Sequence, residues 1–382
     1  MRKILLIITA VFSLAACDLS KLEPAQTKAF IKYFGEDGNT VGADLLKLDD
    51  GYLLLGNNNE TNALLIKTDL KGNTLWGQVF ANFTGRALAK MNEGYFIIGD
   101  SIDNVNPPRM RLIKTDLEGN KQTSTTLGEV NVAYHGTALT ISSLEEVVVC
   151  GYTVNSTTNT QQTFIFGYNN SDLSNAWSAV RRYGGAGVTR ISSKTINENE
   201  DGEFVWSSLN NNTTIESLRA AKESSVSGGF SILSDYTISG EFGDFTYTSI
   251  GNVAVQTVVG TNNNAIAISN YDSNRPLSNA LIETDGDLSA QVVVRASDGD
   301  FVVLGTTKNT SGTRSDLDFY LTKVGIDGKE GSLTGFTNII GGTGNETGAA
   351  IVQAEDKGFV FLGTMQNLMM LVKVNSKGEL IN

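Results

Sequence analysis

Short apolar runs recur along the chain, and most of them end at a glycine. The clearest are residues 51–56 (Gly-Tyr-Leu-Leu-Leu-Gly), 94–99 and 358–363, with weaker copies at 146–151, 203–206, 255–260 and 300–305. Runs spaced by about fifty residues indicate a repeated unit. Continuous runs of four apolar residues are typical of strands covered on both faces, and helical periodicity is hard to find anywhere. The pattern therefore predicts an all-β fold.

The first repeat divides into four predicted strands. They cover residues 44–48, 52–55, 63–68 and 74–80, and turn sequences at 49–51 and 69–73 separate them. Residues 65–73 and 112–120 are copies that differ only at Lys71 and Glu118, and looser copies lie at 321–329 and 371–379. Four antiparallel strands in a unit repeated seven times predict a seven-bladed β-propeller, in which the repeated residues are mainly structural.

The two ends of the repeats complement each other. The last repeat ends its third strand near Val374 and leaves little chain for a fourth, whereas residues 29–35 precede the first inner strand and resemble residues 75–80. We therefore expect residues 30–34 to complete the seventh blade, which would remove an open sheet edge. The predicted propeller domain covers residues 29–382, and its blade boundaries between 180 and 300 stay open.

The loops between second and third strands vary most in length. From the closing glycine to the first leucine of the third strand the offset is 9 in the first repeat, 13 in the second, 16 in the sixth and 8 in the seventh. These loops are rich in Asn, Thr and Ser, as at 57–62, 155–160, 210–214, 262–264 and 308–313. Variable loops on a rigid scaffold favour a binding face. Plain polar connectors are the alternative.

The N-terminus has the pattern of an export signal. Arg2 and Lys3 precede an apolar run at 4–12, and small residues lead to Cys17. Residues 14–17 (Leu-Ala-Ala-Cys) resemble the bacterial lipobox, and this resemblance implies cleavage before Cys17 and acylation of that residue, with palmitate as one acyl group. We expect a signal peptide at 1–16 and a lipidated cysteine with a flexible tether at 17–28. The alternative is an ordinary signal with an incidental cysteine.

An anchor of this kind implies a place in the bacterial cell envelope, but the sequence does not decide which membrane holds it. Asp18 resembles an inner-membrane retention signal of enterobacterial lipoproteins, a rule that does not extend to all groups. Lys21 with Leu22 and Glu23 weakly resembles surface-export signals of other groups. We favour the outer membrane.

Charge and cysteine content limit the classes of partner and of chemistry that the chain can have. The net charge is −12, and removal of residues 1–16 deletes two bases and no acids, which gives −14. This balance argues against nucleic acid as a partner and against a body that lies flat on anionic lipid. Cys150 follows three valines and is expected to be a small buried hydrophobe without a disulfide partner.

Residues 66–76 resemble the repeat of pyrroloquinoline-quinone-type propellers, and the glycine-flanked runs are similar to secreted bacterial repeats. A lipid-anchored propeller also resembles the scaffold lipoprotein of the outer-membrane barrel-assembly machinery. These resemblances cover most of residues 30–382 and imply a scaffold role for the repeated Asp and Trp. They assign no catalytic residue to this chain.

Candidate chemistry is sparse. The single histidine, His135, excludes metal sites that need two or three imidazoles, and it is expected to be a loop or rim residue. Acid-Gly-acid segments at 285–287 and 298–300 fit tight turns better than calcium loops. Asp44 and Glu346 are carboxylates near inner strands, as a glycosidase would need. Trp76, Trp177 and Trp206 are expected to pack between blades. No catalytic, cofactor-binding or metal-binding residue is assigned.

The leading hypothesis is therefore a non-enzymatic binding or scaffold protein, anchored by lipid at Cys17, whose partner is an unidentified envelope protein or glycan. The main alternative is a propeller enzyme of glycosidase or lyase type that acts on polysaccharide. A quinone-dependent dehydrogenase is a third possibility, which the scarcity of basic and aromatic residues disfavours. No cofactor is expected.

Overall fold

The computed structural model describes residues 28–35, 39–102, 107–185, 190–210, 214–221, 230–237, 240–248, 251–258, 264–272, 275–284, 286–308, 316–325 and 335–381. The predicted signal peptide, Cys17 and nearly all of the tether lie outside these residues, as do residues 103–106, 211–213, 259–263 and 309–315 of the second-to-third-strand loops. Within the described ranges all regular elements are β-strands, which confirms the all-β prediction. In the same part of the chain, no helix has the length and apolar character needed to cross a bilayer.

The described strands pair antiparallel into seven four-stranded sheets. The first and second sheets contain β2 (Thr40–Leu48), β3 (Gly51–Asn58), β4 (Asn62–Asp69), β5 (Thr74–Ala81), and β6 (Phe83–Met91), β7 (Gly94–Ser101), β8 (Arg109–Thr115), β9 (Lys121–Leu127). The third and fourth contain β10 (Val132–Ile141), β11 (Glu146–Asn155), β12 (Thr160–Asn169), β13 (Arg181–Tyr183), and β14 (Arg190–Glu198), β15 (Glu203–Asn210), β16 (Thr214–Ala221), β17 (Phe230–Thr237). The fifth and sixth contain β18 (Gly240–Thr248), β19 (Gly251–Val258), β20 (Ala265–Asp272), β21 (Arg275–Ile282), and β22 (Asp287–Arg295), β23 (Phe301–Lys308), β24 (Leu317–Val324), β25 (Phe336–Ile340). The seventh contains β26 (Glu346–Gln353), β27 (Phe359–Met365), β28 (Leu368–Val374) and β1 (Phe30–Phe34).

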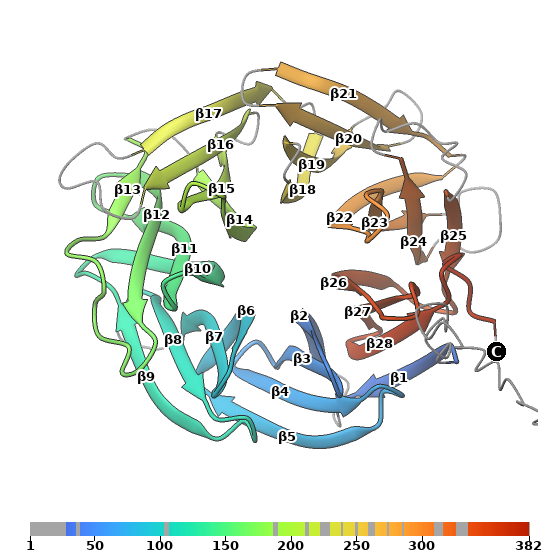
Figure 1. Cartoon of the computed structure of the whole chain (residues 1–382), viewed down its shortest axis with the longest axis horizontal. Helices are drawn as coiled ribbons and strands as arrows, with labels where there is room; N and C mark the ends of the chain where they lie inside the picture. Colours follow the sequence, from blue (N-terminus) through green and yellow to red (C-terminus); the bar gives the residue numbers. More distant parts are fainter. Residues whose placement is uncertain are drawn as a thin grey trace, which may run out of the picture.

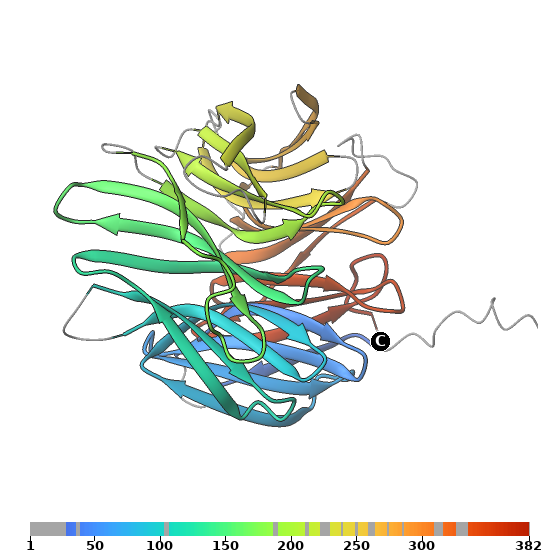
Figure 2. The same cartoon turned by 60° about the vertical axis from the view of Figure 1, so that its left-hand side comes forward.

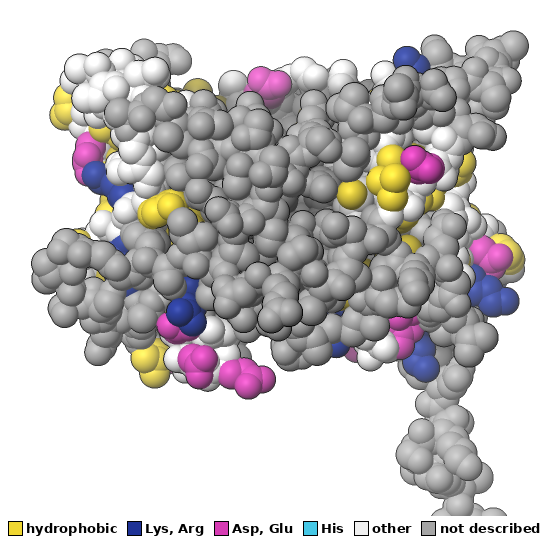
Figure 3. Space-filling view, turned by 90° about the horizontal axis from the view of Figure 1, so that it is seen from above, with side chains coloured by type: hydrophobic (Ala, Val, Ile, Leu, Met, Phe, Trp, Pro, Cys, Tyr) yellow, Lys and Arg dark blue, Asp and Glu magenta, His cyan; other side chains and the backbone are white. Residues whose placement is uncertain are grey.

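Figure 1 shows the sheets placed around a common centre, with the first strand of each sheet innermost. Figure 2 shows the same strands in an oblique view, in which neighbouring sheets lie one above another. This arrangement is β-propeller-like. On the side drawn in Figure 3, acidic side chains of the described residues lie at several separate places and do not form one patch.

The strand β1 belongs to the last sheet although it comes first in sequence. Phe30 pairs with Lys373 and Phe34 pairs with Met369 along an antiparallel register. The predicted pairing of residues 30–34 with the last repeat is therefore confirmed. The carboxyl end of the chain lies beside β1 and β28 in Figure 1, so both ends of the described chain meet at one place on the outside of the ring.

The apolar runs form the second strands, and their burial explains the sequence pattern. All eight residues of β7 are buried, as are the first six of β3. Cys150 is fully buried in β11, which confirms the prediction of a small core residue. The tryptophans also pack as predicted: fully buried Trp206 donates its indole N–H to Thr163 Oγ1 of the preceding sheet at 3.1 Å, and the Trp177 and Phe204 rings lie 5.7 Å apart.

Every inner strand of the described sheets contains a register shift, and four of these lie at glycines: Gly42, Gly85, Gly136 and Gly348. A Cβ on Gly85 would lie 2.8 Å from Leu55, and one on Gly136 would lie 2.6 Å from Ile98. Glycine therefore lets an apolar side chain of the preceding sheet pack directly on the inner strand. Because a β-bulge bends the strand locally, the next sheet follows at an angle.

The near-identical motif of the first two repeats forms a turn that joins neighbouring sheets. Asp69 Oδ1 accepts hydrogen bonds from the backbone N–H groups of Lys71 and Asn73, both at 2.8 Å, and Gly72 takes the left-handed φ of 74° that the turn needs. The turn packs on the outer strand of the preceding sheet, where Lys32 Nζ donates to Asn73 Oδ1 at 3.0 Å. The repeated residues are thus structural, as predicted.

Candidate functional site

The loops between second and third strands lie at one end of the sheets, here called the loop face. Those that the structure describes include 59–61 in the first sheet, 156–159 in the third and 366–367 in the seventh. Left-handed backbone angles occur at Asn59, Asn159 and Asn367 in these loops, which are therefore tight turns. The described loops fit the interpretation as plain connectors, and the longer ones fall mostly outside the described residues.

Four side chains meet near the loop face between the second and third sheets, and we call them the loop-face cluster. Asp100 Oδ2 lies 2.9 Å from His135 Nδ1 and 3.4 Å from Arg86 Nη2. The His135 ring stacks on Tyr152, with ring centroids 4.7 Å apart. His135 lies within β10 and not in a loop, which corrects the expectation that it is a loop or rim residue. Its backbone pairs with Tyr152 across the sheet, and this register fixes the stacking.

The cluster rests on the inter-sheet bonding of the inner strands. At the bulge of β10, Gly136 donates its backbone N–H to Asp100 Oδ1 at 3.1 Å. The same bond joins Gly85 to Asn57 Oδ1 at 2.8 Å and Gly42 to Thr364 Oγ1 at 3.0 Å. In all three cases the acceptor immediately follows the closing glycine of a second strand. Asn or Thr therefore suffices for this bond, and a carboxylate is not needed for it.

The carboxylate of Asp100 supplies what Asn57 and Thr364 do not. Its Oδ2 atom contacts His135 and Arg86, while its Oδ1 atom accepts the backbone N–H of Gly136. The Asp100 side chain is 9% exposed and that of His135 is 21% exposed, whereas the Arg86 side chain is 52% exposed. The cluster thus holds an accessible cation and a partly accessible imidazole on rigid strands.

Burial and charge also act on the tyrosine of the cluster. Burial raises the pKa of the Tyr152 hydroxyl above its usual value, and the negative charge of Asp100 raises this pKa further. Tyr152 therefore keeps its proton at neutral pH and can donate a hydrogen bond. When His135 donates its Nδ1–H to Asp100, Nε2 of the neutral ring is the acceptor.

The arrangement suits binding of polar or anionic groups, and it also contains elements of acid–base chemistry. An imidazole held by a carboxylate is the orienting part of a general base. Within the part of the chain that the structure describes, His135 has no serine, threonine or cysteine as a hydrogen-bond partner. The cluster does not form a nucleophilic triad there.

The two carboxylates expected for a glycosidase lie in different surroundings. Asp44 accepts backbone N–H groups from Leu45 at 2.8 Å and from Leu88 of the next inner strand at 2.7 Å. Glu346 is fully buried at the start of β26 and borders a pocket on the outside of the ring. Asp44 therefore joins two sheets and serves the scaffold.

Replacing Asp44 with alanine is expected to lower the free energy of unfolding by about 1–3 kcal/mol, because the buried backbone N–H groups of Leu45 and Leu88 lose their acceptor. Equilibrium urea unfolding of Asp44→Ala measures this loss. Asp44→Asn is the control, since its amide oxygen retains one of the two bonds, and it should lose less. Equal stability of Asp44→Ala and the wild type would contradict the scaffold role.

The remaining candidates are structural or lie outside the described residues. Asp298 forms an ion pair with Lys323. Burial alone would raise the pKa of Asp298, but the hydrogen bond and the charge of Lys323 lower this pKa below its usual value, and Asp300 lies 3.5 Å from the same ammonium. These contacts fit the predicted tight turn. Asp285 is not among the described residues. In the described ranges, no three His, Cys, Asp or Glu side chains gather as a metal site would require.

Comparison with known proteins finds solved structures of similar fold but no protein family that matches the sequence. No family model matches the sequence, and no curated protein matches it. A prolyl endopeptidase structure superposes with a TM-score of 0.50 at 10% identity, over 87% of this chain and 48% of that one. A glucose dehydrogenase (TM-score 0.46, 10% identity, 78% and 99% covered) and the Trypanosoma rangeli sialidase (TM-score 0.45, 9% identity, 90% and 59% covered) are also similar. This chain spans about half the length of the prolyl endopeptidase, and the likeness shows a propeller-like fold alone.

Sequence reasoning found His135 but missed its three partners. Arg86 is the bulged residue of β6, and Asp100 and Tyr152 each follow a closing glycine. One signal was available in the sequence. The residue after the closing glycine is Asn57, Asp100, Tyr152, Thr306 and Thr364 in the five clear repeats, and Asp100 is the one carboxylate among them.

Proposed function

We propose that this protein is a lipid-anchored binding or scaffold protein of the bacterial cell envelope, held in the outer membrane by acyl chains on Cys17, palmitate among them. Its body is a seven-bladed β-propeller in which β1 completes the last blade and closes the ring. Seven four-stranded sheets among the described residues and the pairing of β1 with β28 support this architecture. The lipobox-like residues 14–17 support the anchor.

The observation that carries the binding proposal is the carboxylate of Asp100. It replaces the neutral acceptors found at Asn57 and Thr364 and uses its spare oxygen to hold Arg86 and His135 near the loop face. A function in binding explains this extra charge, since the scaffold bond does not require it. The exposed guanidinium of Arg86 suits acidic or hydroxyl-rich groups of an envelope protein or glycan. The net negative charge disfavours nucleic acid.

Crosslinking in intact cells tests this proposal. A photoreactive residue at exposed Thr157, in the second-to-third-strand loop of the third sheet, is expected to capture a partner. Glu93, exposed in the turn between β6 and β7 at the opposite end of the sheet, is the control position and should capture none. Asp100→Asn should lower the yield at Thr157 several-fold without unfolding the protein, because asparagine can still accept the N–H of Gly136 as Asn57 does for Gly85.

Capture from Glu93 alone, or an unchanged yield in Asp100→Asn, would contradict a binding role for the cluster. If the Asp100→Asn variant is folded, its crosslinking yield reports on the charge of Asp100, because the substitution removes the charge and leaves the shape of the side chain nearly constant. Circular dichroism and urea unfolding of this variant establish that it is folded.

The second candidate function is a propeller enzyme that acts on polysaccharide, and the His135–Asp100 pair favours its lyase form. Such a reaction needs a base and a cation that neutralises a sugar carboxylate, roles that His135 and Arg86 fit. Incubation of the purified protein with uronate-containing polysaccharide, followed by ultraviolet absorbance of unsaturated products, tests it. Turnover that His135→Gln abolishes would replace the binding proposal.

A further inference from the structure

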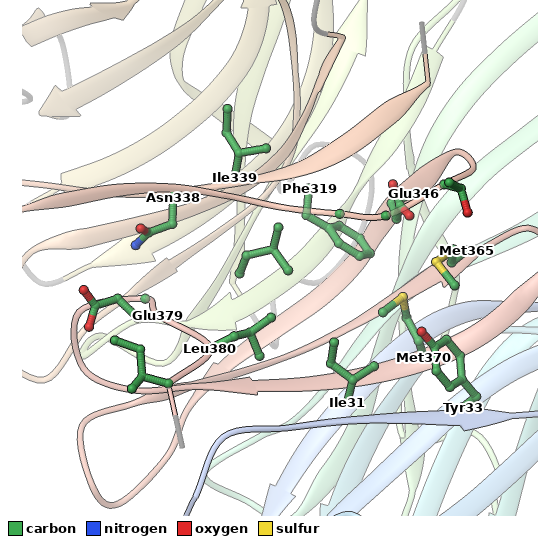
Figure 4. A pocket seen from close by; sticks show the side chains of 16 residues that line it. Ile31, Tyr33, Phe319, Asn338, Ile339, Glu346, Met365, Met370, Glu379 and Leu380 are labelled. Carbon is green, nitrogen blue, oxygen red and sulfur yellow. The ribbon is translucent and has the colours of Figure 1, made fainter. Parts of the chain in front are cut away.

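A pocket of about 580 Å³ lies on the outside of the ring between β25, β1 and the C-terminal segment that follows β28. Figure 4 shows Ile31 and Tyr33 from β1, Ile339 from β25 and Leu380 from the C-terminal segment around it. We call these four residues with Ile381 the rim groove. Their exposed fractions range from 39% to 61%.

The rim groove concentrates apolar surface in one place. Its five residues are among thirteen large apolar side chains that are exposed in the described part of the chain. Single exposed apolar residues are ordinary, but a contiguous group of them marks an interaction surface. The pleat of β1 explains the group: buried Phe34 packs with Tyr52 and Leu54 of the first sheet, and the alternate residues Ile31 and Tyr33 face the groove.

The position of the N-terminus indicates what covers the groove. The described chain begins at Lys28, two residues before β1, and Cys17 precedes Lys28 by eleven residues. Eleven residues span at most about 36–40 Å when fully extended. An acyl anchor on Cys17 therefore brings a bilayer surface within reach of Ile31 and Tyr33.

We propose that the rim groove rests on the lipid bilayer that holds the acylated Cys17, an inference that depends on the proposed anchor. Tyr33 combines an apolar ring with a hydroxyl, a combination that suits the boundary between acyl chains and headgroups. Lys28 and Lys377 are exposed at the ends of the segments that flank the groove and can meet anionic headgroups. Glu379 also lines the groove and accepts a hydrogen bond from Asn375 Nδ2.

This contact fixes the orientation of the whole molecule. The groove lies between outer strands, so the ring stands on its edge at the membrane (Figure 1). The loop face, which carries Arg86 and His135, then points along the membrane and stays open to other envelope components. An edge-on contact also agrees with the net charge of −14 after removal of residues 1–16, because the contact is confined to this pocket, whose lining includes two carboxylates, Glu346 and Glu379.

The test uses the mature, acylated full chain in vesicles of phosphatidylethanolamine and phosphatidylglycerol that contain spin-labelled acyl chains. An environment-sensitive fluorophore is placed at Tyr33→Cys and, separately, at Ile339→Cys. Val79→Cys is the matched control, because Val79 is 65% exposed on the outer strand β5 of another sheet. Cys150 is buried and does not compete for the label.

Quenching by spin-labelled lipid is expected to be several-fold stronger at positions 33 and 339 than at position 79. Equal, weak quenching at all three positions in protein that floats with the vesicles overturns the groove proposal and leaves the anchor intact. Blue-shifted emission at 33 without lipid quenching also overturns it, because another protein or a second copy then covers the groove. Wild-type protein that does not float with vesicles refutes the anchor, and the inference falls with it.

Discussion

Replacing Phe34 with alanine is expected to lower the free energy of unfolding by about 3–5 kcal/mol, which is the usual cost of a phenylalanine-sized cavity in a core. Phe34 is 7% exposed and belongs to one buried apolar cluster with Tyr52, Leu54 and Met369, so this cluster joins β1 to the first and seventh sheets. Among the described strands, β1 pairs with β28 alone. Loss of Phe34 therefore weakens the contact that holds the two ends of the chain together. Equilibrium urea unfolding followed by tryptophan fluorescence measures the effect.

Tyr33→Ala is the control for this prediction, because Tyr33 is adjacent in β1 and 51% exposed. Its cost should stay within about 1 kcal/mol, as for most surface substitutions. Limited proteolysis provides a second measure, since a loosened β1 should be cut faster in Phe34→Ala than in Tyr33→Ala. Equal stability of the two variants would contradict the proposal that β1 closes the ring.

Replacing Lys373 with methionine is expected to destabilise the protein by about 3–5 kcal/mol, because removal of one partner leaves a buried charge uncompensated. Lys373 has no exposed side-chain surface, and its ammonium lies 2.9 and 2.7 Å from the two carboxylate oxygens of Asp356. Asp356 itself is 5% exposed. The double variant Lys373→Met with Asp356→Leu should recover part of the loss, since both charges are then absent.

The repeats supply a matched control for the buried pair. Lys67 occupies the same place in the first repeat and lies 2.7 Å from Asp50, but the Asp50 side chain is 62% exposed. The hydrogen bond from Lys67 lowers the pKa of Asp50, and solvent screens the pair. Lys67→Met should therefore cost less than about 1 kcal/mol. Urea midpoints of the two single variants compare them directly, and similar losses would contradict the dependence on burial.

The positions of the strands could be predicted from the sequence because the patterns that mark them are local. The run at 51–56 was predicted as a strand, and β3 covers Gly51–Asn58. The predicted first-repeat strands all fall within β2 to β5, which extend them by a few residues. A strand buried on both faces needs a continuous apolar run, so the run itself reveals the strand. The repeats between 180 and 300 carry weaker runs, and there the sequence left the boundaries open.

The candidate site was not readable in the same way. His135 was noticed as the single histidine, yet Asp100 lies 35 residues earlier and belongs to another sheet. The bond from Gly136 to Asp100 and the bond from Leu88 to Asp44 both cross between sheets, over 36 and 44 residues. Hydrophobic periodicity says which face of a strand is buried and does not say which polar side chain of the next sheet it meets.

The sequence by itself determined the all-β class, the repeated four-stranded unit, the pairing of residues 30–34 with the last repeat and the structural nature of the repeated motif. Each of these follows from local turn chemistry and from apolar runs that have to be buried. Only the tertiary structure decided that Asp100, Arg86, His135 and Tyr152 meet, and that Ile31, Tyr33 and Ile339 border one groove. Contacts between sheets depend on the angle and spacing at which the bulged inner strands place neighbouring sheets. No stretch of adjacent residues encodes this placement.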